Sequence, residues 1–216
     1  MAKFVLSFFA ALMLGHGAFA GNEAKIVIPA FDDKYSGFVR QLEAGQTDIN
    51  YTEFRNSFLE SEQFKVIANQ NPDLQTLRTT MRELMKSSKY PEIIDVTKKM
   101  LSLDYTNMEA HKILQQTYKI LGDTGNAKKY HDIEFGLLNS IVRKGDGKSC
   151  RSGWPVVQVE EEYFILGMLG ANVRKQSVDN TGGVCDKIEV ETPEGNATYY
   201  FEISKVFEGY KKRGIK

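Results

Sequence analysis

Apolar residues recur every three or four positions through residues 48–143, which is the spacing of one buried face of an α-helix. The pattern predicts five helices in this region. The first carries the aromatic stripe Tyr51, Phe54 and Phe58. The others cover 74–85, 93–101 (with a proline at its start), 113–121 (ended by Gly122) and about 126–143, the last closing at Gly145 as a left-handed stop.

A spacing of 34 residues links two of the predicted helix pairs. The same three positions of a helix-turn-helix unit are filled by Leu84, Ser88 and Ile93, and then by Tyr118, Gly122 and Ala127. Glycine and alanine at the last two positions are typical of tetratricopeptide repeats, where small residues let two helices approach. Two repeats are visible, over about 73–140, and three are usually required for a free-standing array. We therefore expect a short tetratricopeptide-like stack capped by its neighbours.

The helical spacing of apolar residues ends at a polar loop over 144–149. A valine-rich run over 154–159 predicts a strand, and further strands are predicted over 173–178, 184–191 and 197–203. The turn residues Pro-Glu-Gly-Asn at 193–196 predict that the last two strands form a hairpin.

Two short helices are predicted among these strands. Three consecutive glutamates at 160–162 suit the first turn of a helix, because the N-terminus of a helix carries partial positive charge. Tyr163, Leu166 and Leu169 are expected on its buried side, with Gly170 at its end. A final helix is expected over 204–210. The chain is thus predicted to be α+β: a tetratricopeptide-like helical half, then a small antiparallel sheet packed with one or two helices.

The first twenty residues are typical of a secretory signal peptide. Lys3 precedes an apolar run over 4–14, and Ala18-Phe19-Ala20 is a small-x-small cleavage site. The run is too short to span a bilayer, which needs about 20 apolar residues. We expect four segments: the signal peptide 1–20, an extended lead-in 21–47, the helical region 48–145 and the sheet region 146–216. The predicted location is periplasmic or secreted, after cleavage near Ala20.

Charge and cysteine content narrow the choice of partners and compartment. Removing the leader from the 216-residue chain leaves 27 basic and 28 acidic residues, so nucleic acid is not an expected partner. No later apolar run is long enough to span a membrane. Cys150 and Cys185 are the only cysteines, and in an exported chain we expect them to pair. The alternative, a redox or metal-binding pair, lacks the close spacing that such sites use.

Several short motifs together resemble a known family. They are Tyr51-x-x-Phe54-Arg55-x-x-Phe58-x-x-Ser61, Asp146-Gly147-Lys148-Ser149, Glu161-Glu162-Tyr163, Leu169-Gly170, Gln176-Ser177, Asp186 and Tyr200-Phe201. In this order the chain is similar to exported bacterial proteins, mainly of Bacteroidota, grouped as domain-of-unknown-function family 4919. The resemblance covers most of residues 48–210. It implies export and a two-part build, and it implies no activity.

Established catalytic and metal-binding patterns are missing from the sequence. His111 and His131 lack the close histidine partner of a zinc site, and His111 is expected to be core filler. We expect no catalytic residues, no cofactor and no metal ion. The glutamates at 160–162 could form a catalytic carboxylate pair, but neighbours on a helix do not face one another, so a negatively charged first turn is the simpler interpretation.

One group of polar residues remains a candidate site: Asp146, Lys148, Ser149, Gln176, Ser177 and, if the helices fold back over the sheet, Arg55. The simpler alternative is a hydrogen-bond network that ties the loop to the sheet. The leading hypothesis is a non-enzymatic binding or scaffold protein of the bacterial envelope with a peptide or protein partner. The alternatives are an envelope hydrolase with an unrecognised site and a periplasmic maturation or stress factor.

Overall fold

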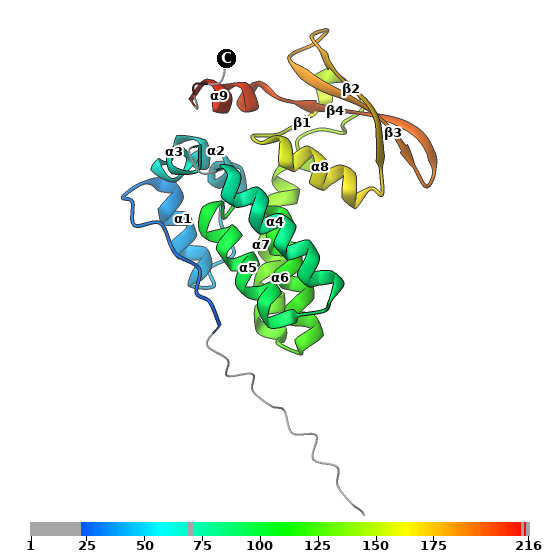
Figure 1. Cartoon of the computed structure of the whole chain (residues 1–216). Helices are drawn as coiled ribbons and strands as arrows, with labels where there is room; N and C mark the ends of the chain where they lie inside the picture. Colours follow the sequence, from blue (N-terminus) through cyan, green and yellow to red (C-terminus); the bar gives the residue numbers. More distant parts are fainter. Residues whose placement is uncertain (1–22, 69–70, 213, 215–216) are drawn as a thin grey trace, which may run out of the picture.

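The computed structural model describes residues 23–68, 71–212 and 214, so the predicted signal peptide lies outside the described residues. Helices come first along the chain and a small sheet follows (Figure 1). The elements are α1 (Lys34–Glu43), α2 (Tyr51–Glu60), α3 (Glu62–Ala68), α4 (Asn71–Lys86), α5 (Tyr90–Leu103), α6 (Met108–Leu121), α7 (Thr124–Val142), the 3-10 turn η1 (Cys150–Ser152), β1 (Trp154–Pro155), α8 (Val159–Met168), β2 (Asn172–Asp179), β3 (Cys185–Thr192), β4 (Gly195–Glu202) and α9 (Ser204–Lys212). This confirms the α+β class.

Local sequence signals account for both ends of α6. The Asn107 side chain caps α6 by accepting from the Ala110 amide, and Gly122 ends it with φ 80°. Ser88, 34 residues earlier, has φ 52° and is the only non-glycine residue of the described chain in the left-handed region. The two helix pairs therefore turn in the same way. Whether they are tetratricopeptide repeats stays a prediction.

The sheet has the order β1-β4-β3-β2. The β3–β4 hairpin and the β2–β3 pair are antiparallel, as predicted, but β1 runs parallel to β4, so the sheet is mixed. The strand expected over 154–159 is only two residues long. It stops early because Pro155 has no amide hydrogen and Gln158 is already the residue before α8.

Two further sequence expectations are corrected by the structure. The lead-in 21–47 is not extended throughout, because Asp33 caps α1 and Tyr35, Val39 and Leu42 bury one side of it. The helix before the loop, α7, ends at Val142 with Arg143 as its C-cap, rather than at a left-handed Gly145. Gly145 is needed for another reason: a Cβ atom there would lie 2.2 Å from the Ser152 carbonyl oxygen.

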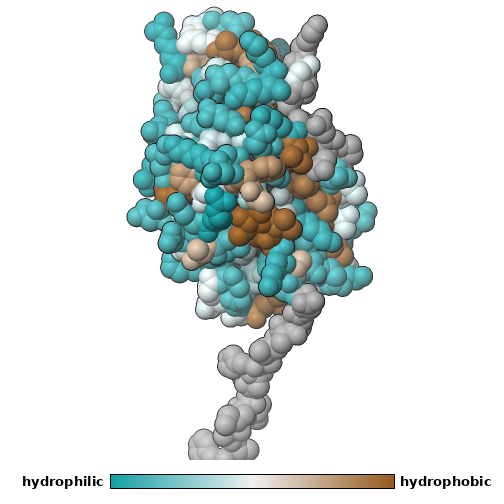
Figure 2. All heavy atoms as spheres, turned by 90° about the vertical axis from the view of Figure 1, so that its left-hand side faces the viewer, coloured by the Kyte–Doolittle hydropathy of each residue, from teal (hydrophilic) through white to brown (hydrophobic). Residues whose placement is uncertain are grey.

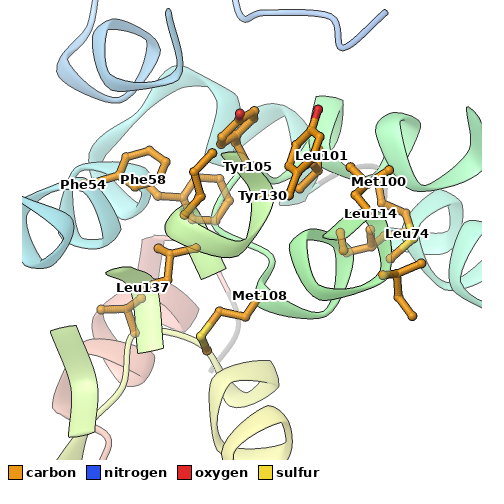
Figure 3. Close-up of a cluster of buried hydrophobic side chains, with 14 of the residues drawn as sticks. Phe54, Phe58, Leu74, Met100, Leu101, Tyr105, Met108, Leu114, Tyr130 and Leu137 are labelled. Atoms are coloured by element: carbon orange, nitrogen blue, oxygen red, sulfur yellow. The ribbon is translucent and has the colours of Figure 1, made fainter. Parts of the chain in front are cut away.

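One continuous cluster of buried apolar side chains extends from the helices into the sheet. Figure 3 shows part of it, where Phe54 and Phe58 of α2 approach Tyr105 and the α7 residues Tyr130 and Leu137. The predicted regions 48–145 and 146–216 therefore share a core. At the other end of the chain, α9 returns from the sheet towards α2 and α3 (Figure 1).

Hydrophilic residues cover most of the face that carries α1, with apolar residues in small patches (Figure 2), which is normal for a protein surface. Cys150 and Cys185 form the predicted disulfide, with Cα atoms 5.6 Å apart. Within the part of the chain that is described, each helix is too short or too polar to cross a bilayer.

Candidate functional site

A cleft of about 650 Å³ opens between α8 and the helices α4 and α6. Pockets that hold small ligands usually measure about 300–1,000 Å³. Figure 1 shows α8 between the helical layer and the sheet, so the cleft lies where the two halves of the chain meet. Its lining residues are Arg78, Arg82, Asp104, Thr106, Asn107, Met108, Glu109, Lys112, Ile113, Gln158, Val159, Glu160, Glu161, Tyr163, Phe164, Gly167 and Met168.

One face of α8 forms the first wall of the cleft. Glu160, Tyr163, Phe164, Gly167 and Met168 recur at helical spacing and share this face. Tyr163 is 47% exposed and Met168 46% exposed. The wall is therefore mainly apolar and open to solvent.

The buried face of α8 differs from the prediction. Leu166 is buried, as predicted. Tyr163 and Leu169 were expected inside but are exposed, whereas Glu161 and Glu162 are buried. The glutamates do occupy the first helical turn, as predicted. The prediction failed for Tyr163 and Leu169 because Glu161 pairs with Arg55 and Glu162 lies beside Asp186, and a local pattern does not reveal these distant neighbours.

The opposite wall, from α4 and α6, is rich in positive charge. Glu109 lies 3.1 Å from Arg78 Nε and 3.7 Å from the Arg82 guanidinium. The Lys112 Nζ lies 2.7 Å from the sulfur of Met168 and 5.7 Å from the centre of the Phe164 ring. Among the described residues no carboxylate is within salt-bridge distance of Lys112.

Asp104 forms part of the floor of the cleft. Its carboxylate accepts hydrogen bonds from the Thr106 amide (2.8 Å), the Thr106 hydroxyl (2.6 Å) and the Gln158 side chain (3.2 Å). Burial raises the pKa of Asp104 to about 6, against the opposing effect of these hydrogen bonds. Both carboxylate oxygens are occupied, so this group joins the start of α8 to the helical layer.

A buried ion pair fixes α8 behind the cleft. Arg55 of α2 donates from Nε and Nη2 to the two oxygens of Glu161, at 2.6 Å each. The same guanidinium donates to the Ser140 hydroxyl and to the Pro155 carbonyl. Glu161 also accepts from the Val157 amide at 2.8 Å. Arg55 thus reaches α8 and the end of β1.

Glu162 points to the other side of α8, towards the sheet. It is fully buried, and within the described chain no donor reaches either carboxylate oxygen. Burial, followed by the adjacent Asp186 carboxylate, raises the pKa of Glu162 to about 9. The protonated Glu162 can then donate a hydrogen bond to Asp186, so the pair holds one proton at neutral pH.

Gln176 connects this carboxyl pair to the cleft. Its amide donates to Asp186 at 2.7 Å, and its carbonyl accepts from the Tyr163 hydroxyl at 2.9 Å. Ser177 is the next residue of β2, where it pairs with Lys187 of β3. Of the candidate residues singled out from the sequence, Gln176 and Arg55 are thus bonded through their side chains to residues that line the cleft, Tyr163 and Glu161.

The loop members of the predicted polar group lie together, in a separate place. The Asp146 carboxylate accepts from the Lys148 amide at 3.0 Å and from the Ser152 hydroxyl at 2.5 Å. Ser149 shares a 2.8 Å hydrogen bond with Ser152. The structure thus divides the six candidate residues among this loop, β2 and the Arg55 ion pair.

His111 and His131 lie outside the cleft lining. His111 is fully buried, and its Nε2 lies 2.7 Å from the Tyr105 carbonyl oxygen. Burial lowers the pKa of His111 to about 4, so the ring is neutral at physiological pH. Over the described residues, no group of three or more His, Cys, Asp or Glu side chains is arranged to hold a metal ion.

The sequence reasoning missed Arg78, Lys112 and the outer face of α8. A signal was present, because the helix 159–168 has large apolar residues on both sides. A helix that is apolar all round is usually buried all round. An apolar outer face that remains exposed on such a helix therefore indicates a candidate binding site.

The fold and the site together define an α+β protein with a cleft at the junction of a helical layer and a sheet. The chain belongs to the family described as a domain of unknown function (DUF4919), whose model matches residues 33–212. Neither the curated proteins nor the solved structures contain a match.

Proposed function

We propose that this protein is an exported, non-enzymatic binding protein of the bacterial envelope, and that the cleft between α4, α6 and α8 holds a peptide segment of its partner. The observation that carries the proposal is the outer face of α8. Tyr163, Phe164 and Met168 place apolar surface on an open wall, whereas Ile165 and Leu166 are buried in the core. Exposed apolar surface that lines a groove is typical of an interaction site.

The polar groups around the cleft support binding rather than turnover. Asp104 already accepts three hydrogen bonds, and Glu161 is held by Arg55. Both carboxylates therefore act as supports of the cleft walls. A floor that is already held by hydrogen bonds and an ion pair suits recognition of a peptide, because the protein loses little conformational entropy on binding.

Gly167 allows the cleft to be filled without disturbing the core. A Cβ atom added at Gly167 meets no other atom within 4 Å, and a side chain there also favours the helix. Gly167→Trp should therefore fold normally and obstruct the site. Gly37→Trp is the matched control, since Gly37 also lies in a helix, α1, with its nearest neighbour 4.0 Å from an added Cβ.

The test is selection of a random-peptide display library on the whole mature protein. We expect peptides that bind the native protein and the Gly37→Trp variant but bind Gly167→Trp at least about tenfold more weakly. If selection yields no peptide that distinguishes Gly167→Trp from the other two proteins, the cleft is not a peptide site. Export is tested separately by mass analysis of the mature chain, which should begin at Gly21.

A further inference from the structure

The charges on the two walls of the cleft differ, and this difference specifies a ligand. Resting on the proposed function, we infer that the cleft selects peptide segments in which an acidic side chain lies beside a large apolar one. The acidic group would pair with Lys112 of α6, and the apolar group would lie on Phe164 and Met168 of α8.

Lys112 carries the electrostatic part of the inference. Its ammonium group reaches across the cleft to a thioether and an aromatic ring, which are weak partners for a full charge. The two arginines of the same wall share the single carboxylate of Glu109. This wall therefore has three cations and one anion among its lining residues. Glu134 of α7, outside the lining, also interacts electrostatically with Lys112. A carboxylate supplied by a ligand would offset part of the remaining positive charge.

A basic peptide would meet the opposite situation. Glu109 is already engaged by Arg78 and Arg82, and Glu161 is buried in its ion pair with Arg55. Glu160 is the remaining carboxylate at the mouth of the cleft, since Asp104 is closed off by hydrogen bonds on the floor. Repulsion from the arginines and Lys112 would outweigh a single contact with Glu160.

The apolar part of the site is adaptable. Met168 places a half-exposed, flexible thioether on the α8 wall, and Phe164, Ile113 and the buried Met108 lie among the lining residues. Methionine side chains repack easily around different apolar groups, so the site can accept more than one kind of large side chain. We therefore expect selectivity for charge to be sharper than selectivity for apolar shape.

The test uses the peptides recovered by selection on the whole mature protein, sorted by their dependence on Gly167. Peptides that Gly167→Trp excludes should be enriched in Asp and Glu next to Leu, Phe or Trp, and depleted in Lys and Arg. Lys112→Glu should weaken their binding by about tenfold or more, and Lys112→Met by less. Lys119→Glu, an exposed change on the same helix outside the cleft, should leave affinity unchanged.

Salt dependence supplies an independent readout. Binding should weaken when salt is raised from about 0.05 M to about 0.5 M, and a peptide with Gln in place of its acidic residue should lose this dependence. Cleft-dependent peptides that are neutral or basic, or acidic ones unaffected by Lys112→Glu, would overturn this inference and leave the proposed function standing. Absence of any cleft-dependent peptide would overturn both. Binding to vesicles of anionic phospholipid that is lost in Lys112→Glu, without acidic peptides, would assign the charge to a membrane and also overturn it.

Discussion

Replacing Glu162 by glutamine should make the fold less sensitive to rising pH. The pKa of Glu162 is about 9 in the folded protein, against a usual value of 4.5. Between these values the unfolded chain has an ionised carboxylate and the folded chain a protonated one. The folded state then binds more protons, so its stability falls as pH rises through this window, by up to about 1.4 kcal/mol per pH unit.

The side-chain amide that Glu162→Gln introduces would still donate a hydrogen bond to Asp186 but would not titrate. Relative to the native protein, we expect the variant to gain stability as pH rises. The gain between about pH 5 and about pH 8 is up to about 4 kcal/mol, which is the slope above taken over three pH units. The value is an upper limit, because Asp186 shares the proton and relaxes part of the penalty.

Urea unfolding at a series of pH values measures this effect. Trp154, the single tryptophan, is buried and stacked on Tyr199, so its fluorescence reports the loss of the core. Glu92→Gln is the matched control because Glu92 also lies in the first turn of a helix, α5, but is exposed and far from Glu162 in the sequence. Its stability curve should run parallel to that of the native protein. A constant difference between Glu162→Gln and the native protein at all pH values would refute the assignment of a proton to Glu162.

Three other changes test the framework that holds the cleft. Arg55→Ala should lower the free energy of unfolding by about 3–5 kcal/mol, because it leaves the buried Glu161 carboxylate without its counter-ion. A decrease below about 1 kcal/mol in urea unfolding would contradict the burial of the Arg55–Glu161 pair. Non-reducing peptide mapping should recover Cys150 joined to Cys185, and free thiols in the purified mature protein would refute the link. Reducing this disulfide should lower the free energy of unfolding by about 4 kcal/mol, because the unfolded chain regains the entropy of a loop with a sequence separation of 35. Gly147→Ala should lower the melting temperature, since Gly147 has φ 66° and an added Cβ would lie 2.8 Å from the Trp154 ring; an unchanged melting temperature would show that the loop can move away.

The sequence by itself determined the elements whose signals are local. The helices that contain 51–58, 74–85 and 113–121 follow from apolar spacing, and the last of them ends at Gly122, as predicted. The hairpin between β3 and β4 follows from its turn residues, and the disulfide from the two isolated cysteines of a chain with a leader-like start. In each case the residues that decide the structure are close together in sequence, or are the only ones of their kind.

Only the tertiary structure decided which side of α8 is buried, and with it the candidate site. Glu161 is stabilised inside the protein by Arg55, 106 positions earlier in the chain. Glu162 is buried in its protonated form beside Asp186, which lies on β3, later in the chain. A buried carboxylate is costly without such partners, so a reading of the helix alone places it outside. Once long-range pairing turns the glutamates inward, Tyr163 and Met168 are turned outward, and they become the apolar wall opposite Lys112.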